Sequence, residues 1–207
     1  MSHGIVPNRV AEGARFGVTP LARLLHAVGV SANAVTIVGG ALTLVGAAFL
    51  GLAMPLAALV LLVLGTLADT LDGQLAKASG GGTRFGAFLD STVDRIADAA
   101  LFTGTIALAI AIPHMPLLWW ALLALVSSSL VPYVRAKAES LGARASVGPA
   151  PREARVVVFL LGLAGWAIFD AFGLFVAAVA AVALTASLTL VLRFVAVARQ
   201  LRDTGRS

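Results

Sequence analysis

Five aspartates lie inside a strongly apolar stretch of this chain. Asp69 and Asp72 are three positions apart, and Asp90, Asp94 and Asp98 follow one another at intervals of four. On helices, each set lies on one face. One charged side chain at the centre of a bilayer costs roughly 2.5–3.5 kcal/mol. These carboxylates therefore lie near the water interface or bind cations, and carboxylate oxygens suit hard divalent ions such as Mg²⁺ and Mn²⁺.

The rest of the chain is apolar enough to cross a membrane several times. Hydrophobic residues make up 59% of the 207 positions and charged residues only 12%, whereas a soluble domain carries about 25% charged residues. The mean hydropathy is +0.97. We expect an all-α polytopic membrane protein with six transmembrane helices, preceded by an N-terminal amphipathic helix on the membrane surface. The expected spans are residues 33–53, 55–78, 84–111, 116–138, 153–169 and 172–198.

The distribution of charged residues and of helix-ending residues divides the chain into three parts. We expect an amphipathic juxtamembrane segment at 1–30, a six-helix transmembrane catalytic domain at 31–198 and a basic cytoplasmic tail at 199–207. With both termini in the cytoplasm, all 15 Lys and Arg fall at the inner ends of spans or in inner segments, as the positive-inside rule requires. The prediction is a multi-pass protein of the cell membrane with a cytoplasmic active site. The same rule explains the net charge of +5, so nucleic acid is not expected as a partner.

The link between the second and third spans, Ser-Gly-Gly-Gly-Thr at 79–83, predicts a tight turn between antiparallel helices. It lacks the Gly-Lys-Ser/Thr ending of a P-loop. Counted from this link at 1.5 Å per residue, Asp69, Asp72, Asp90 and Asp94 lie at overlapping depths of roughly 8–15 Å. The residues alone therefore predict a membrane-embedded, oxygen-ligated divalent metal site that opens to the cytoplasm.

The same residues carry a family resemblance. The motif Asp69-x2-Asp72-Gly73-x2-Ala76-Lys77-x8-Gly86-x3-Asp90-x3-Asp94 resembles the signature of the CDP-alcohol phosphatidyltransferases. Lys77 stands where that family usually has arginine, which keeps the charge but loses the forked donor geometry. The resemblance implies an enzyme that moves the phosphatidyl group of CDP-diacylglycerol to an alcohol and releases CMP. It also implies two divalent ions, Mg²⁺ or Mn²⁺, and a homodimer.

The resemblance assigns roles to individual residues. Asp69, Asp72, Asp90 and Asp94 would bind the metal ions, and Asp94 would also be the general base for the acceptor hydroxyl. Asp98 lies outside the motif, and we expect it either to support the site or to pair with Arg95. The CDP moiety would be held by Asn33, Thr36, Asp72, Gly73, Ala76 and Lys77.

Within the family, the chain is similar to the actinobacterial phosphatidylinositol phosphate synthases, which implies inositol 1-phosphate as the acceptor. The similarity is carried by residues 80–90 and 133–139 and by two arginines at the start of the fifth span. Those enzymes have a Glu-Arg-Pro-Glu-Arg run where this chain has Pro-Arg-Glu-Ala-Arg at 151–155. Apolar residues surround Arg193, and a lone arginine in that setting is expected to face the bundle interior. We expect the acceptor phosphate to bind Arg135, Arg152, Arg155 and Arg193.

Two alternatives remain. The first keeps the chemistry and changes the acceptor to glycerol 3-phosphate, as in a phosphatidylglycerol phosphate synthase, or, less favoured, to serine. The second is a cation or proton transporter that uses intramembrane carboxylates. A transporter needs polar residues along a path through the bilayer, and the outer halves of the expected spans have almost none.

Overall fold

The computed structural model describes residues 20–22 and 24–204, and these residues form helices and short links without any β-strand. The prediction of an all-α fold is therefore confirmed. The helix ends agree with the expected spans to within two residues, except that the last helix continues beyond residue 198. The long helices are α2 (Ala32–Gly51), α3 (Pro55–Ala78), α4 (Arg84–Ala111), α5 (Met115–Ser140), α6 (Arg152–Phe169) and α7 (Phe172–Thr204).

The expected amphipathic segment, residues 1–30, lies largely outside the described residues. Its described part is helical at 20–22 and 24–27. Gly29 follows with a φ of +80°, a left-handed conformation that often ends helices. His26 Nδ1 lies 3.3 Å from Ser79 Oγ, so this part of the chain contacts the end of α3.

The turn between α3 and α4 is short because glycines allow its backbone conformation. Gly80 and Gly81 have φ values of +90° and +114°, which other residues rarely adopt. The Gly81 N–H donates to the Ala76 carbonyl at 3.1 Å and closes the end of α3. Thr83 caps α4 by accepting a hydrogen bond of 2.9 Å from the Gly86 N–H. The two helices consequently run antiparallel from this turn, as expected.

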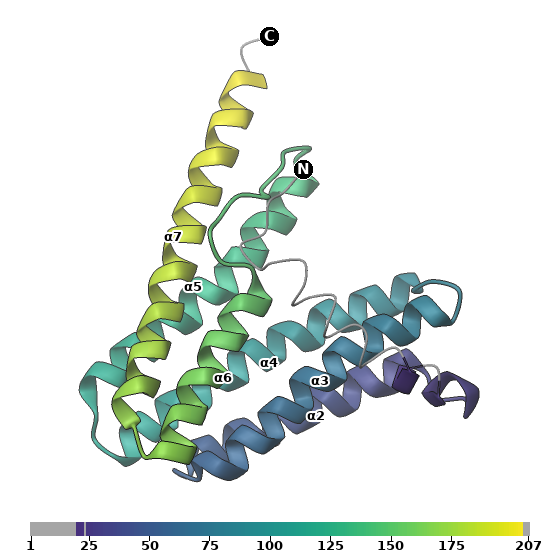
Figure 1. Cartoon of the computed structure of the whole chain (residues 1–207). Coiled ribbons are helices and arrows are strands. Elements are labelled where there is room, and N and C mark those ends of the chain that lie inside the picture. Colours follow the sequence, from purple (N-terminus) through teal and green to yellow (C-terminus); the bar gives the residue numbers. More distant parts are fainter. Residues whose placement is uncertain (1–19, 23, 205–207) are drawn as a thin grey trace.

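The helices form two groups. Figure 1 shows α2, α3 and α4 side by side, and α5, α6 and α7 side by side; the groups meet at one end and diverge toward the other. Glycines let α2 approach both of its neighbours. A Cβ at Gly39 of α2 would lie 2.9 Å from the Ala68 Cβ of α3, and a Cβ at Gly40 would overlap the Val93 side chain of α4. This close packing holds α3 and α4 together at the level of their aspartates.

Aromatic side chains join the two groups at the end where they meet. The Phe159 ring of α6 packs edge-on against Phe102 of α4, with a centroid distance of 6.2 Å, and against Phe175 of α7 at 5.4 Å. Phe159 and Phe175 are fully buried. Edge-on pairs of this kind add stability beyond the area they bury. The two groups are therefore joined by buried aromatic contacts at this end.

Four helices, α2, α3, α5 and α7, are long and apolar enough to cross a membrane, which supports a membrane protein. The other two fall short because of their charges. Every 18-residue stretch of α4 includes Asp94, Arg95 and Asp98, and the 18 residues of α6 begin with three charged residues in its first turn. Three of these charges, on Asp94, Arg152 and Arg155, belong to the predicted site.

Candidate metal and substrate site

Three of the aspartates predicted to bind metal come together from two helices. Asp69 and Asp72 belong to α3 and Asp90 belongs to α4, and one carboxylate oxygen from each lies within 4.8 Å of the others. We call these three residues the carboxylate trio. Hard divalent ions bind carboxylate oxygens at about 2.0–2.6 Å, so small side-chain rotations would let all three reach one ion. The donor set therefore fits Mg²⁺ or Mn²⁺.

Asp72 is the most enclosed member of the trio. Its residue is only 6% exposed, and the Thr36 hydroxyl of α2 donates to Asp72 Oδ2 at 2.5 Å. The same hydroxyl lies 3.1 Å from the Ala32 carbonyl. A buried carboxylate needs compensation by hydrogen bonds or positive charge, and a divalent ion in the trio would supply that charge. Thr36, expected at the CDP moiety, donates to a predicted metal ligand and orients it.

The other residues predicted to bind CDP lie beside the trio. A Cβ at Gly73 would meet nothing within 4 Å, and a glycine inside a helix costs about 1 kcal/mol relative to alanine. Neither packing nor a left-handed φ therefore requires glycine here, and the open space suits close approach of a ligand to the backbone. Ala76 is half-buried and Lys77 is exposed in the last turn of α3. Asn33 lies beside the start of α4, since a Cβ at Gly86 would be 3.1 Å from its Oδ1.

Asp94 contacts Arg152 from α6. Arg152 Nη1 lies 2.8 Å from Asp94 Oδ1 and 3.6 Å from Asp69 Oδ2, while its Nε donates to Asp98 Oδ1 at 3.0 Å. Arg95 lies farther away, with its Nη2 at 3.5 Å from Asp94 Oδ2. Asp98 therefore pairs with Arg152 rather than with Arg95. Arg152, expected at the acceptor phosphate, places its guanidinium on carboxylates of α3 and α4.

Arg155 and Arg193 bind backbone carbonyls around the link between α5 and α6. Arg155 is 6% exposed and donates to the Ala150 carbonyl at 3.1 Å. Arg193 of α7 donates to the carbonyls of Val147 and Val131, each at 3.1 Å. A guanidinium has five N–H donors, so both side chains keep donors for a further ligand.

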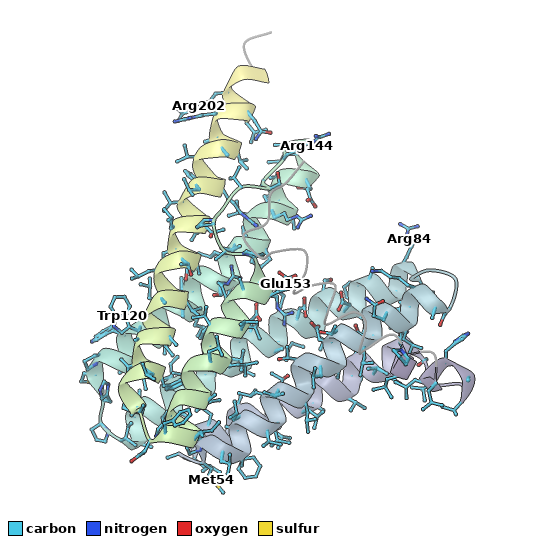
Figure 2. All side chains as sticks on the ribbon, viewed as in Figure 1. Met54, Arg84, Trp120, Arg144, Glu153 and Arg202 are labelled. Atoms are coloured by element: carbon cyan, nitrogen blue, oxygen red, sulfur yellow. The ribbon has the colours of Figure 1, made fainter. Side chains whose placement is uncertain are left out.

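The four predicted arginines form a chain of neighbouring charges, which we call the arginine row. Arg155 interacts electrostatically with Arg152 and Arg193, and Arg193 interacts with Arg135. Arg135 is exposed and pairs with Glu139 at 2.9 Å. Because Arg152 also contacts Asp94, one end of the row touches the aspartates. Figure 2 shows Glu153, the neighbour of Arg152, in the angle between the two helix groups.

A small cavity lies behind Arg152, between α4, α5, α6 and α7. Its polar lining comes from Asp98, Ser128, Arg152 and Arg155. Ser128 is 2% exposed, and its Oγ has no hydrogen-bond partner among the described residues. The space suits about one water molecule, which would satisfy this hydroxyl. Ser128 belongs to a serine run at 127–129, a composition typical of helix packing, and that pattern by itself does not indicate a cavity.

Comparisons with known proteins agree with this arrangement. The family model described as CDP-alcohol phosphatidyltransferase matches residues 29–192. A phosphatidylinositol phosphate synthase of Mycobacterium tuberculosis is 39% identical over 146 residues, covering 70% of this chain and 67% of the relative. One from Cutibacterium acnes is 47% identical over 105 residues, covering 50% of each chain.

Solved structures agree as well. The crystal structure of the Mycobacterium tuberculosis phosphatidylinositol phosphate synthase with CDP-DAG bound has a TM-score of 0.78 and 33% identity, covering 87% of this chain and 92% of that chain. The same enzyme in complex with manganese and citrate has a TM-score of 0.79 and 34% identity, covering 87% and 88%. This chain therefore belongs to the CDP-alcohol phosphatidyltransferase family.

Proposed function

We propose that this protein transfers the phosphatidyl group of CDP-diacylglycerol to inositol 1-phosphate, forming phosphatidylinositol phosphate and CMP. The observation that carries this proposal is the carboxylate trio lying next to the arginine row. A metal-binding group beside a cationic pocket suits a reaction in which both substrates carry phosphate. The names of the similar proteins support the same donor and acceptor.

The motif residues would bind the metal ions and the CDP moiety of the donor. Asp69, Asp72, Asp90 and Asp94 would hold two divalent ions, Mg²⁺ or Mn²⁺, and such ions neutralise phosphate charge during displacement at phosphorus. Thr36 orients Asp72 through its hydrogen bond of 2.5 Å. The CDP moiety would bind along α2 and α3. It would lie over the open backbone at Gly73 and near the ammonium group of Lys77.

The acceptor is deprotonated as it attacks. We propose that Asp94 takes the proton of the acceptor hydroxyl, whose oxygen forms a bond to the phosphatidyl phosphorus. The bond from that phosphorus to the CMP oxygen breaks, and CMP leaves as a phosphate monoester. An aspartate can serve as base here because cations near the acceptor oxygen make its proton easier to remove.

The acceptor phosphate would bind the buried and half-buried part of the arginine row, namely Arg155 and Arg193, with Arg135 at its exposed end. Guanidinium groups match the forked geometry of a phosphate monoester, whereas a free polyol needs neutral hydroxyl partners. Inositol 1-phosphate and glycerol 3-phosphate share that phosphate. Free inositol and serine lack it and should not be used.

For the membrane, we propose that all six long helices cross the bilayer within a catalytic domain at 31–198. Residues 1–30 would lie on the surface, and 199–207 would form a cytoplasmic tail. Figure 2 supports this orientation, since Arg84, Arg144 and Arg202 lie away from Met54, at the ends that would face the cytoplasm. We further propose both termini and the active site in the cytoplasm, location in the cell membrane, and, from the family resemblance, a homodimer.

The test uses the purified protein in nanodiscs with CDP-diacylglycerol, Mn²⁺ and one acceptor at a time, measuring CMP release and lipid product. Inositol 1-phosphate should give phosphatidylinositol phosphate. Efficient turnover with glycerol 3-phosphate alone would reassign the acceptor. Absence of CMP release with every acceptor, together with cation flux in proteoliposomes, would favour a transporter.

A further inference from the structure

We propose that Arg152 is a positioning residue that holds Asp94 and competes with a divalent ion for its carboxylate, and that Asp98 binds the same guanidinium and keeps it paired when Asp94 is released. The inference deepens the proposed function and rests on it for the role of Asp94. It differs from the expectation that Arg152 binds the acceptor phosphate directly.

The first argument is the geometry of the guanidinium. Arg152 uses its Nε on Asp98 at 3.0 Å and its Nη1 on Asp94 at 2.8 Å. The Arg152 side chain is 21% exposed, that of Asp98 is 9% exposed and that of Asp94 is 18% exposed. Charge-assisted hydrogen bonds of this length are strong when they are shielded from water. Arg155 and Arg193, in contrast, donate to neutral carbonyls, which a phosphate can displace more easily.

The second argument is the spacing of the two carboxylates. Asp94 and Asp98 are four residues apart on α4, so they lie on one face, where a single guanidinium can reach both. The α-carbons of α4 and α6 stay more than 8 Å apart throughout. At the charged end of α6, the Arg152 side chain therefore connects α6 to α4. It does so through two carboxylates, and one of them, Asp98, lies outside the metal-binding motif.

Competition follows from the charges. Asp94 Oδ1 contacts Arg152 and its Oδ2 lies 3.5 Å from Arg95, so both oxygens face cations. A divalent ion at Asp94 would be repelled by a guanidinium at this range. The carboxylate trio should therefore bind the first ion. A second ion would bind Asp94 only as Arg152 withdraws toward Asp98, which keeps the guanidinium paired while Asp94 is released.

The test compares Arg152→Gln with Arg155→Gln, which removes the same charge three residues later on α6, at a side chain that contacts no aspartate of the motif. Mn²⁺ binding is measured by electron paramagnetic resonance on the full chain in detergent, without substrates. Arg152→Gln should tighten the weaker Mn²⁺ site about tenfold, the effect of removing a nearby like charge. Arg155→Gln should change that affinity by less than about threefold, because its charge lies farther away.

Kinetics with saturating Mn²⁺ distinguish positioning of Asp94 from binding of the acceptor phosphate. Arg152→Gln should lower kcat with little change in the acceptor KM, and Arg155→Gln should mainly raise the acceptor KM. Wild-type Mn²⁺ affinity in Arg152→Gln, or an acceptor KM raised as in Arg155→Gln, would overturn the inference. Because Mn²⁺ binding is measured without any acceptor, a wrong acceptor assignment would not change the Mn²⁺ affinity of Arg152→Gln.

A second variant tests the role of Asp98 even if Arg152→Gln fails to fold. Asp98→Asn preserves the shape of the side chain and should leave Arg152 on Asp94, so the weaker Mn²⁺ site should loosen and kcat should fall. Unchanged values for both would contradict the proposal. Where the double variant Asp98→Asn/Arg152→Gln folds, it should bind Mn²⁺ as Arg152→Gln does, since Asp98 acts through Arg152; additive effects would overturn this dependence.

Discussion

Replacing Thr36 with valine removes one hydroxyl from the most enclosed part of the site. Valine has nearly the same shape, so the packing of α2 against α3 should persist. What disappears is the hydrogen bond of 2.5 Å from Thr36 Oγ1 to Asp72 Oδ2. Asp72 is then left buried, with its charge less compensated than before.

The size of the effect follows from that bond. A hydrogen bond to a charged group contributes about 1.5–3 kcal/mol, which corresponds to about a 10- to 150-fold change in an equilibrium constant. Part of this will appear as lower stability without metal, because Asp72 loses a partner in the folded protein. The rest will appear as weaker metal binding, because Asp72 is free to rotate away from the trio. Bound Mn²⁺ should therefore restore much of the lost stability.

The assay is thermal unfolding with and without Mn²⁺, together with Mn²⁺ binding. Thr105→Val is the matched control, because Thr105 is fully buried on α4 and its hydroxyl donates to the Leu101 carbonyl of its own helix. Thr36→Ser keeps the hydroxyl and should keep near wild-type metal affinity. If Thr36→Val bound Mn²⁺ as tightly as Thr105→Val does, Thr36 would have no part in orienting Asp72, and a direct contact with CDP would be the better explanation.

Four further predictions concern the reaction. Asp90→Asn should nearly abolish turnover, and chelation of divalent ions should do the same reversibly; CMP release measures both. Asp94→Asn should lower kcat about a hundredfold or more, as loss of a general base does. An equilibrium binding assay should show that this variant still binds CDP-diacylglycerol. Arg193→Ala should raise the KM for inositol 1-phosphate and leave the donor KM nearly unchanged; equal loss for both would refute an acceptor role. Gly148→Ala should also raise the acceptor KM, because Gly148 has a φ of +136° and a Cβ there would overlap Thr189 of α7, moving the link that binds the Arg193 guanidinium.

The helices were predictable because local signals set their ends. Pro55 begins α3, the two positive-φ glycines at 80 and 81 end it, and Thr83 caps α4. The end of α7 was not predicted well. The expected span stopped where the apolar residues stop, yet residues 199–204 contain neither Gly nor Pro and continue the helix to Thr204. Hydropathy predicts where a membrane span ends, whereas helix-breaking residues determine where the helix itself ends.

The carboxylate trio was predictable for a similar reason. Two antiparallel helices joined by a five-residue turn have a defined register, so counting residues from the turn places Asp69, Asp72 and Asp90 at one depth. No further tertiary information is needed, because the turn belongs to the same local stretch as the aspartates. The prediction that these residues share a level is confirmed by their oxygens lying within 4.8 Å of one another; their roles as ligands stay predictions.

The partner of Asp94 and Asp98 could not be identified in this way. It comes from α6, more than fifty residues later, and several arginines near the cytoplasmic ends of the helices have the same sequence character. Which of them reaches α4 depends on how α6 is placed by α3 and α7 and on the length of a flexible side chain. One local signal was present: two carboxylates four residues apart, only one of them in the motif, offer adjacent acceptors to a single guanidinium. The spacing of these two carboxylates is compatible with one bridging guanidinium, and the structure identifies it as that of Arg152.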